Sequence, residues 1–180
     1  AAAWCRRRKC SVTMNAERLH RYKLMSHSVL CTDRAEVEAT FRLLEEENRS
    51  NPHIVNGMMA PRYLSYDLDA QSVVIEYAVK DWEMNRVGIL HGGILSTMLD
   101  HAAGITVAAF VGGWAPTVDL QVHFLRPGQP GDTILAVGRI ISAGQTLVHA
   151  EASLTSKATG KKLAVCTATF LNMAVRASAL

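Results

Sequence analysis

The pattern of apolar and polar positions is organised around one long, almost wholly apolar segment, residues 91–111. On a helical wheel, apolar side chains occupy most of the circumference of this segment. The small and polar positions fall in a single sector, which contains Gly93, Ser96, Thr97, Asp100, His101 and Gly104. This pattern predicts a buried helix with one polar stripe.

Six further segments have the alternation or the short apolar runs that are typical of strands. They are residues 62–67, 73–79, 117–124, 134–141, 147–155 and 163–171. Ahead of them, residues 34–47 have an apolar face and follow Asp33, a favourable N-cap. The order of helix, two strands, long helix and four strands predicts an α+β domain. In it, an antiparallel sheet wraps around one long central helix, with a short N-terminal helix ahead of the sheet.

Charge separates the chain into two parts. Residues 1–34 contain eight Lys and Arg but only two acidic residues, whereas the whole chain has a formal net charge of +3. We therefore predict a basic leader over 1–34 and a single domain over 35–180. An Arg-rich, acid-poor leader is typical of a mitochondrial transit peptide, although a disordered tail or appended residues would have the same composition. We expect a mitochondrial or cytoplasmic protein with no membrane span and no nucleic-acid partner, because the domain itself is not basic.

The sequence lacks the motifs of several classes of enzyme and metal site. The four cysteines include no Cys-x-x-Cys pair, and Cys166, in a predicted strand, is interpreted as a small buried hydrophobe. The sequence also contains no Gly-x-Ser-x-Gly, Walker loop, Gly-x-Gly-x-x-Gly or His-Glu-x-x-His. We expect neither a metal site nor a cofactor.

The central helix has two features that suggest chemistry. Gly92 and Gly93 stand at its beginning, where we expect uncovered backbone N–H groups that favour partial negative charge. Asp100 is the only carboxylate of the helix. Gly93 and Asp100 are about 10 Å apart along the helix axis, too far to act on one carbonyl. If Gly93 and Asp100 act on the same substrate, they must therefore come from two copies of the chain, as in a symmetric homodimer.

This stretch resembles the hotdog-fold acyl-CoA thioesterases of the PaaI-like group, which includes thioesterase superfamily member two. The resemblance rests on the pattern Asn85-x-x-Gly-x-Leu-His-Gly-Gly followed by Asp100, and on residues 116–127 and 153–161. It implies the hotdog fold and hydrolysis of an acyl-CoA to a free acid and CoA. It also implies a homodimer with shared sites, and family members commonly form tetramers as pairs of dimers.

The resemblance implies roles for four catalytic residues. The amide of Gly93 polarises the thioester carbonyl, and Asp100 of the other subunit acts as general base or attacks the thioester itself. The side chain of Asn85 helps to hold the thioester or water, although a loop-capping role is the structural alternative. Thr117 stands where close relatives have a Ser that orients the water.

The resemblance also implies residues that bind substrate. We expect His91 to lie near the sulfur or to fix the turn, and Gly92 to give the substrate room. Arg126 and Lys157 are candidates for the phosphates of CoA, with ordinary solvated charges as the alternative.

Met58 and Met59 are predicted to line an adaptable acyl pocket, which favours a medium- or long-chain fatty acyl group. Two other functions remain open. One is a non-catalytic acyl-CoA or lipid-binding protein, and the other is a structural oligomer without a ligand. A hotdog dehydratase is disfavoured because its usual Asp-x-Asn-Pro-x-His loop is absent.

Overall fold

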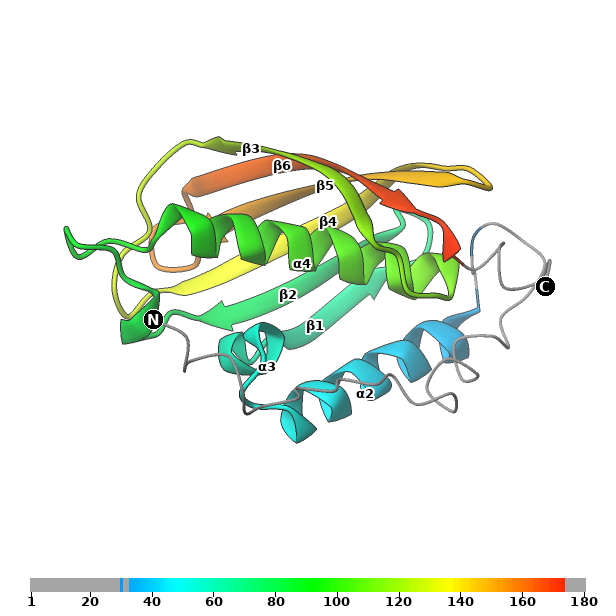
Figure 1. The fold of residues 1–180 in the computed structure, drawn as a ribbon, viewed down its shortest axis with the longest axis horizontal. Helices are drawn as coiled ribbons and strands as arrows, with labels where there is room; N and C mark the ends of the chain where they lie inside the picture. Colours follow the sequence, from blue (N-terminus) through cyan, green and yellow to red (C-terminus); the bar gives the residue numbers. More distant parts are fainter. Residues whose placement is uncertain (1–29, 31–32, 174–180) are drawn as a thin grey trace, which may run out of the picture.

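The computed structural model of the protein describes residue 30 and residues 33–173. The predicted leader lies outside these residues except for its last positions. Within the described part of the chain, six strands form one antiparallel sheet with the order β1-β2-β4-β5-β6-β3 (Figure 1). Their bounds are β1 Arg62–Asp67, β2 Ser72–Ala78, β3 Thr117–Phe124, β4 Thr133–Ala143, β5 Leu147–Ser156 and β6 Lys162–Leu171. The α+β hotdog architecture predicted from the sequence is confirmed.

The central helix α4, Gly92–Val111, lies across one face of the sheet (Figure 1). It begins after His91, whose side chain caps it, and it ends at Gly112, which adopts the left-handed conformation with φ 74°. Most of its side chains are buried against the strands. Cys166 of β6 is buried in the same core, as predicted.

Helix α4 approaches the middle of the sheet closely where it crosses β4. A Cβ atom at Gly138 would overlap the side-chain oxygen of Thr106 and would lie 2.5 Å from the carbonyl oxygen of Ala102. Only a glycine allows the two backbones to pass at this separation. This contact fixes the height of α4, and so of its polar stripe, above the sheet.

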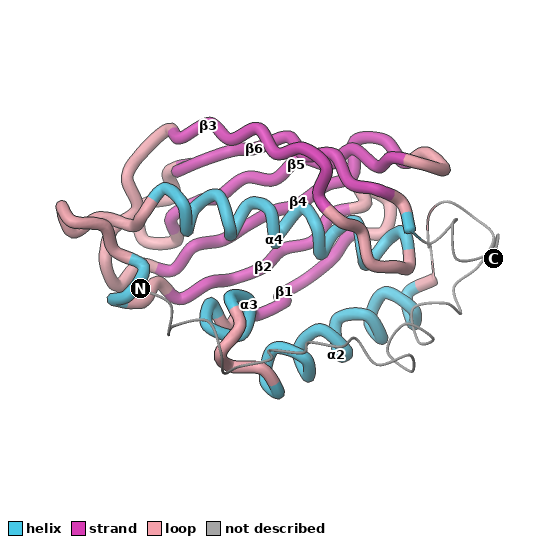
Figure 2. The backbone as a smooth tube through the Cα atoms, viewed as in Figure 1, coloured by secondary structure: helices cyan, strands magenta, loops and turns pink. Residues whose placement is uncertain are grey.

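Helix α2, Arg34–Ser50, lies beside the β1 edge of the sheet (Figure 2). The side chain of Asp33 caps it by accepting a hydrogen bond from the N–H of Ala35, as predicted. Phe41 packs on β1, with its ring centroid 5.3 Å from that of Tyr63 and 5.7 Å from that of Tyr66. Two short elements were not predicted, helix α3 at Val55–Met59 and the 3-10 helix η1 at Asp81–Glu83.

The opposite edge of the sheet, strand β3, is paired on one side only, with β6. Leu120 and Val122 are half-buried on its inner face, as the alternation predicts. The two ends of the strand are open, however: Phe124 is 56% exposed, and Val118, at the register irregularity between Thr117 and Asp119, is 61% exposed. The described residues of a single copy therefore leave an apolar sheet edge uncovered.

One helix bears on the expectation that the protein has no membrane span. Helix α4 has 20 residues and a mean hydropathy of 1.5, so its length and composition would allow a span. In the structure, 72% of the apolar stretch of this helix is buried inside the protein. The apolar length of the helix is explained by its place in the core.

Candidate active site

Two of the predicted catalytic side chains are in direct contact. The hydroxyl of Thr117, the first residue of β3, donates a hydrogen bond of 2.8 Å to Asp100 Oδ1. Asp100 lies near the middle of α4 and is half-buried. This bond holds one carboxylate oxygen in place and leaves Oδ2 as a further acceptor.

Asp100 and Thr117 both line a cavity of about 470 Å³. Its polar wall also includes Thr97 and His101 of α4. The apolar part of the wall comes from elements far apart in the sequence, and includes Leu44, Ile105, Ala108, Trp114 and Phe170. Helix α2 contributes Leu44 and closes the cavity on the β1 side. A carboxylate beside an apolar chamber of this size is a common arrangement for a small-molecule site.

The beginning of α4 differs from the prediction in one respect. The N–H of Gly93 is not uncovered, because it donates a 2.9 Å hydrogen bond to Nδ1 of His91. The imidazole therefore acts as the N-cap, which satisfies a backbone donor that the helix itself leaves unpaired. Gly92 faces the ring of Phe124, which would lie 3.5 Å from a Cβ atom at this position.

Asn85 organises the loop that leads into α4. Its side-chain oxygen accepts hydrogen bonds from the N–H groups of Val87 and Ile89, at 3.0 and 3.3 Å. This is the loop-capping arrangement that the sequence offered as the structural alternative. The side-chain NH₂ group makes no hydrogen bond within the described part of the chain.

The two predicted CoA-binding cations are exposed, and they follow the ends of β3 and β5. These two strands end on the side of the sheet where α4 begins (Figure 1). Arg126 donates to the carbonyl of Lys162 at 3.0 Å. Lys157 forms a 2.7 Å ion pair with Glu76. The loop after Arg126 packs on the start of α4, since the N–H of Leu90 donates to the carbonyl of Gly128.

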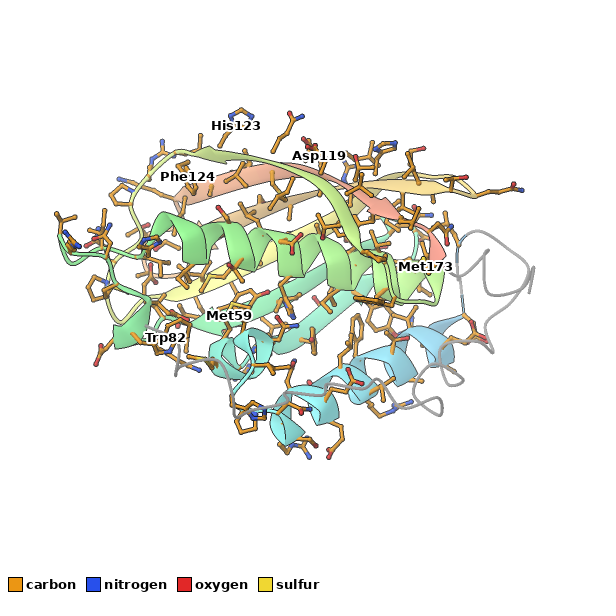
Figure 3. All side chains as sticks on the ribbon, in the orientation of Figure 1. Met59, Trp82, Asp119, His123, Phe124 and Met173 are labelled. Carbon is orange, nitrogen blue, oxygen red and sulfur yellow. The ribbon has the colours of Figure 1, made fainter. Side chains whose placement is uncertain are left out.

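The two methionines predicted to line the acyl pocket do not line the cavity that contains Asp100. Met59 is fully buried on the side of α3 that faces the sheet (Figure 3), and Met58 is 37% exposed. Asn56 of the same helix lines the cavity instead. Helix α3 therefore reaches this cavity through Asn56 and not through either methionine.

The predicted residues therefore form two groups on one chain. Asp100 and Thr117 belong to the cavity, whereas Asn85, His91 and Gly93 gather at the beginning of α4. Seven residues of helix, about 10 Å, separate Gly93 from Asp100. One copy of the chain does not bring the two groups together.

Comparison with known proteins identifies the family. Residues 87–163 match the Thioesterase superfamily. Acyl-coenzyme A thioesterase 13 of Mus musculus is 31% identical over 96 residues, which are 52% of this chain and 68% of that protein. The orthologue of Homo sapiens is 32% identical over 94 residues, which are 51% of this chain and 66% of that protein. The chain belongs to the thioesterase superfamily.

Solved structures agree with this assignment to a family of thioester hydrolases. The zebra fish thioesterase superfamily member 2 has a TM-score of 0.65 and 25% identity, and the match covers 73% of this chain and 96% of the other. A Streptococcus mutans protein bound to acetyl CoA has a TM-score of 0.57 and 26% identity, over 62% of this chain and 86% of the other. The Escherichia coli PaaI protein, with a TM-score of 0.66, 19% identity and coverage of 77% and 94%, shares the fold.

In this thioesterase domain, a buried polar contact that the sequence did not predict joins β2 to α4. The hydroxyl of Tyr77 lies 2.6 Å from Nδ1 of His101. His101 is 7% exposed, and burial lowers its pKa from 6.5 to about 4. The two residues are 24 positions apart, on β2 and α4. They meet only because α4 packs at this position on the sheet.

Proposed function

We propose that the protein hydrolyses acyl-CoA thioesters in a site shared between two copies of the chain. The observation that carries this proposal is the hydrogen bond between Thr117 and Asp100 at the wall of the 470 Å³ cavity. Membership of the thioesterase superfamily supports the reaction class, and the relative bound to acetyl CoA supports the substrate class.

The open edge of the sheet suggests how two copies assemble. Strand β3 begins at Thr117, which contacts Asp100, and ends at Phe124, which lies above the first turn of α4 (Figure 3). Two copies of one strand that pair about a two-fold axis run antiparallel. Such a pair sets Thr117 of one copy against Phe124 of the other. It would therefore bring the partner's helix start, with Gly93, toward Asp100.

The same pairing would cover the exposed apolar side chains of β3. Val118 and Phe124 lose their contact with water when a second β3 is added, and the unpaired backbone groups of the edge gain partners. Both effects favour association through this edge. The dimer thus accounts for the open apolar edge and for the separation of the two residue groups.

In this site Asp100 acts as the general base. Oδ1 is held by Thr117, so Oδ2 accepts a proton from a water molecule as its oxygen attacks the thioester carbonyl. The new C–O bond gives a tetrahedral intermediate. Its collapse breaks the C–S bond, and the sulfur leaves as the CoA thiol after it receives the proton from Asp100. The products are a free acid and CoA.

The N–H of Gly93 from the partner stabilises the oxyanion of that intermediate. In the free chain this N–H is donated to His91, so the imidazole turns aside when the substrate carbonyl takes its place. The side chain of His91 is exposed and does not pack in the core, so this movement costs little free energy. Loss of one oxyanion donor typically lowers the rate about 10² to 10³-fold.

The substrate extends in two directions from the thioester. The apolar cavity wall of Ile105, Ala108 and Phe170 favours a fatty acyl group. The phosphates of CoA lie toward Arg126 and Lys157, at the helix start that supplies Gly93. Lys157 then exchanges its ion pair with Glu76 for a phosphate.

A thiol-release assay tests this function. Free CoA is measured from a series of short, medium and long acyl-CoAs with the native protein, Asp100→Asn and the control Asp69→Asn, which changes an exposed turn. We expect Asp100→Asn to lower kcat by at least about 10²-fold, and the control to retain full activity. Acyl-CoA binding without CoA release by the native protein would instead indicate a binding protein.

A further inference from the structure

The outer face of strand β3 has a symmetric arrangement of polar side chains. Asp119, Gln121 and His123 alternate along the strand with the residues that face α4, and all three are exposed. Asp119 and His123 lie on the side of β3 that is turned away from α4 (Figure 3). A carboxylate and an imidazole thus stand two positions to either side of Gln121.

These two side chains have no partner within one copy. Asp119 and His123 form no side-chain hydrogen bond or ion pair in the described part of the chain. They are four residues apart on one strand, about 13 Å, and so cannot contact each other. Glu151 lines the same hollow of the sheet surface as His123, but it forms a 2.7 Å ion pair with Arg139.

The backbone of β3 limits how a second copy of the strand can pair with it. The N–H of Leu125, directly after the strand, donates to the carbonyl of Leu163 of β6 at 2.8 Å. Backbone groups point alternately to the two sides of a strand, so Leu120 and Val122 direct theirs to the open edge. A second β3 that pairs about a two-fold axis therefore bonds to these even-numbered positions.

Charge distinguishes the registers that remain. With the axis at Gln121, Asp119 of each copy faces His123 of the other, once on each side of the axis. With the axis at Leu120, Asp119 faces Gln121 and both charges lack a partner, and with the axis at Asp119 two carboxylates meet. On the inner face, the register centred on Gln121 pairs Leu120 with Val122, which are both half-buried.

We propose that two copies of β3 pair about a two-fold axis at Gln121, and that the two Asp119–His123 pairs select this register. The inference rests on the proposed function, because it takes the dimer with shared sites and fixes how its two copies align. An imidazole donates a hydrogen bond to a carboxylate whether it is neutral or charged, so each pair is attractive in either state.

The register matters for the active site because it sets the position of one helix start along the other chain. In the proposed register, the irregular start of one strand, Thr117 and Val118, faces Phe124 of the other. A slip to the register centred on Leu120 would move the partner by two residues, about 7 Å. Catalytic geometry tolerates far smaller errors than this. The two pairs thus align the amide of one copy with the carboxylate of the other.

Cysteine cross-linking tests the register. Gln121→Cys and Leu120→Cys are compared in a chain whose Cys5, Cys10 and Cys31 are replaced by Ser. In the proposed register, two copies of position 121 are directly opposite at a Cα separation of about 4.5 Å, whereas two copies of position 120 are diagonal at about 7 to 8 Å. A disulfide spans the first distance but not the second. We expect only Gln121→Cys to form a covalent dimer on mild oxidation. The reverse result would overturn the proposed register.

Charge reversal tests the two pairs. His123→Asp sets a second carboxylate against Asp119 on both sides of the axis and should raise the Kd of the dimer about tenfold. The double variant Asp119→His with His123→Asp exchanges the two groups and should restore the native Kd. His149→Asp changes an exposed histidine on the same face of the sheet and should leave the Kd unchanged. An unchanged Kd for His123→Asp would overturn the role of the pairs.

The cross-linking result is separable from that of the proposed function. A covalent Gln121→Cys dimer that releases no CoA from any acyl-CoA would support the register and overturn hydrolysis. A protein that releases CoA but forms no covalent dimer through position 121 would support hydrolysis and overturn this inference.

Discussion

The hydroxyl of Thr117 donates a 2.8 Å hydrogen bond to Asp100 Oδ1 and so joins the start of β3 to the middle of α4. The two residues are 17 positions apart. The contact places the only carboxylate of the helix at the end of the open sheet edge. Asp100, the proposed general base, is thus joined directly to β3, the strand through which we propose that two copies pair.

Replacement of Thr117 tests the function of this bond. Thr117→Val keeps the shape of the side chain but removes the donor, so the carboxylate of Asp100 is less well oriented. We expect kcat to fall about tenfold, since the loss corresponds to one hydrogen bond to a charged group. Thr117→Ser keeps the hydroxyl and should retain most of the activity. Equal activity of the Val and Ser variants would exclude a role for the bond.

Isotope labelling distinguishes a general base from a nucleophile at Asp100. In a single turnover with excess enzyme in heavy-oxygen water, the general-base route places the heavy oxygen directly in the acid product. A covalent route would first transfer an ordinary carboxylate oxygen from Asp100 to the product when water attacks the aspartyl carbon. We expect labelled acid in the first turnover, measured by mass spectrometry. Unlabelled acid would show that Asp100 attacks the thioester.

The β3 edge should control both assembly and activity. Val118 is 61% exposed in one copy, and Val118→Lys would place a charge in the proposed interface. We expect a monomer in analytical ultracentrifugation, with activity reduced about 10²-fold or more because each site loses the partner's Gly93. Val55→Lys, which changes a similarly exposed residue of α3, should keep the native mass and activity. A fully active Val118→Lys monomer would refute the shared site.

The sequence predicted the elements well because their signals are local. The long apolar segment and the alternating strands have strong periodicity, and Asp33 and Gly112 mark helix ends by their own chemistry. The short elements α3 and η1 were missed, since a helix of one turn has no resolvable period. For the same reason, the sequence could not tell which residue of α3 faces the cavity.

His101 gives stability a defined dependence on pH. Burial lowers its pKa from 6.5 to about 4, so between these values the unfolded chain binds the proton and the folded chain does not. The free energy of unfolding therefore decreases as pH falls through this window, by at most about 3 kcal/mol. Urea unfolding at several pH values should show a shallower dependence for His101→Gln. Identical slopes in the two proteins would show that His101 titrates normally.

The site itself was only partly predictable. The motif pattern proposed Asp100, Gly93 and Thr117, and it left open that His91 fixes the turn. Histidine is not a common N-cap, so its bond to the N–H of Gly93 could not be specified in advance. The contact of Tyr77 with His101 depends on how α4 lies on the sheet, and Gly138 fixes that height by steric contact. Sequence periodicity contains no information on such long-range packing.

Subunit complementation tests the central claim, a site made by two chains, most directly. Asp100→Asn lacks the base, and Gly93→Pro lacks the amide donor at a first-turn position where proline is tolerated. Each variant alone should be nearly inactive. After the two are unfolded and refolded together, half of the dimers contain both variants and have one intact site, so CoA release should recover to about a quarter of the native rate. Two dimeric, folded variants that give no recovery when mixed would contradict the shared site.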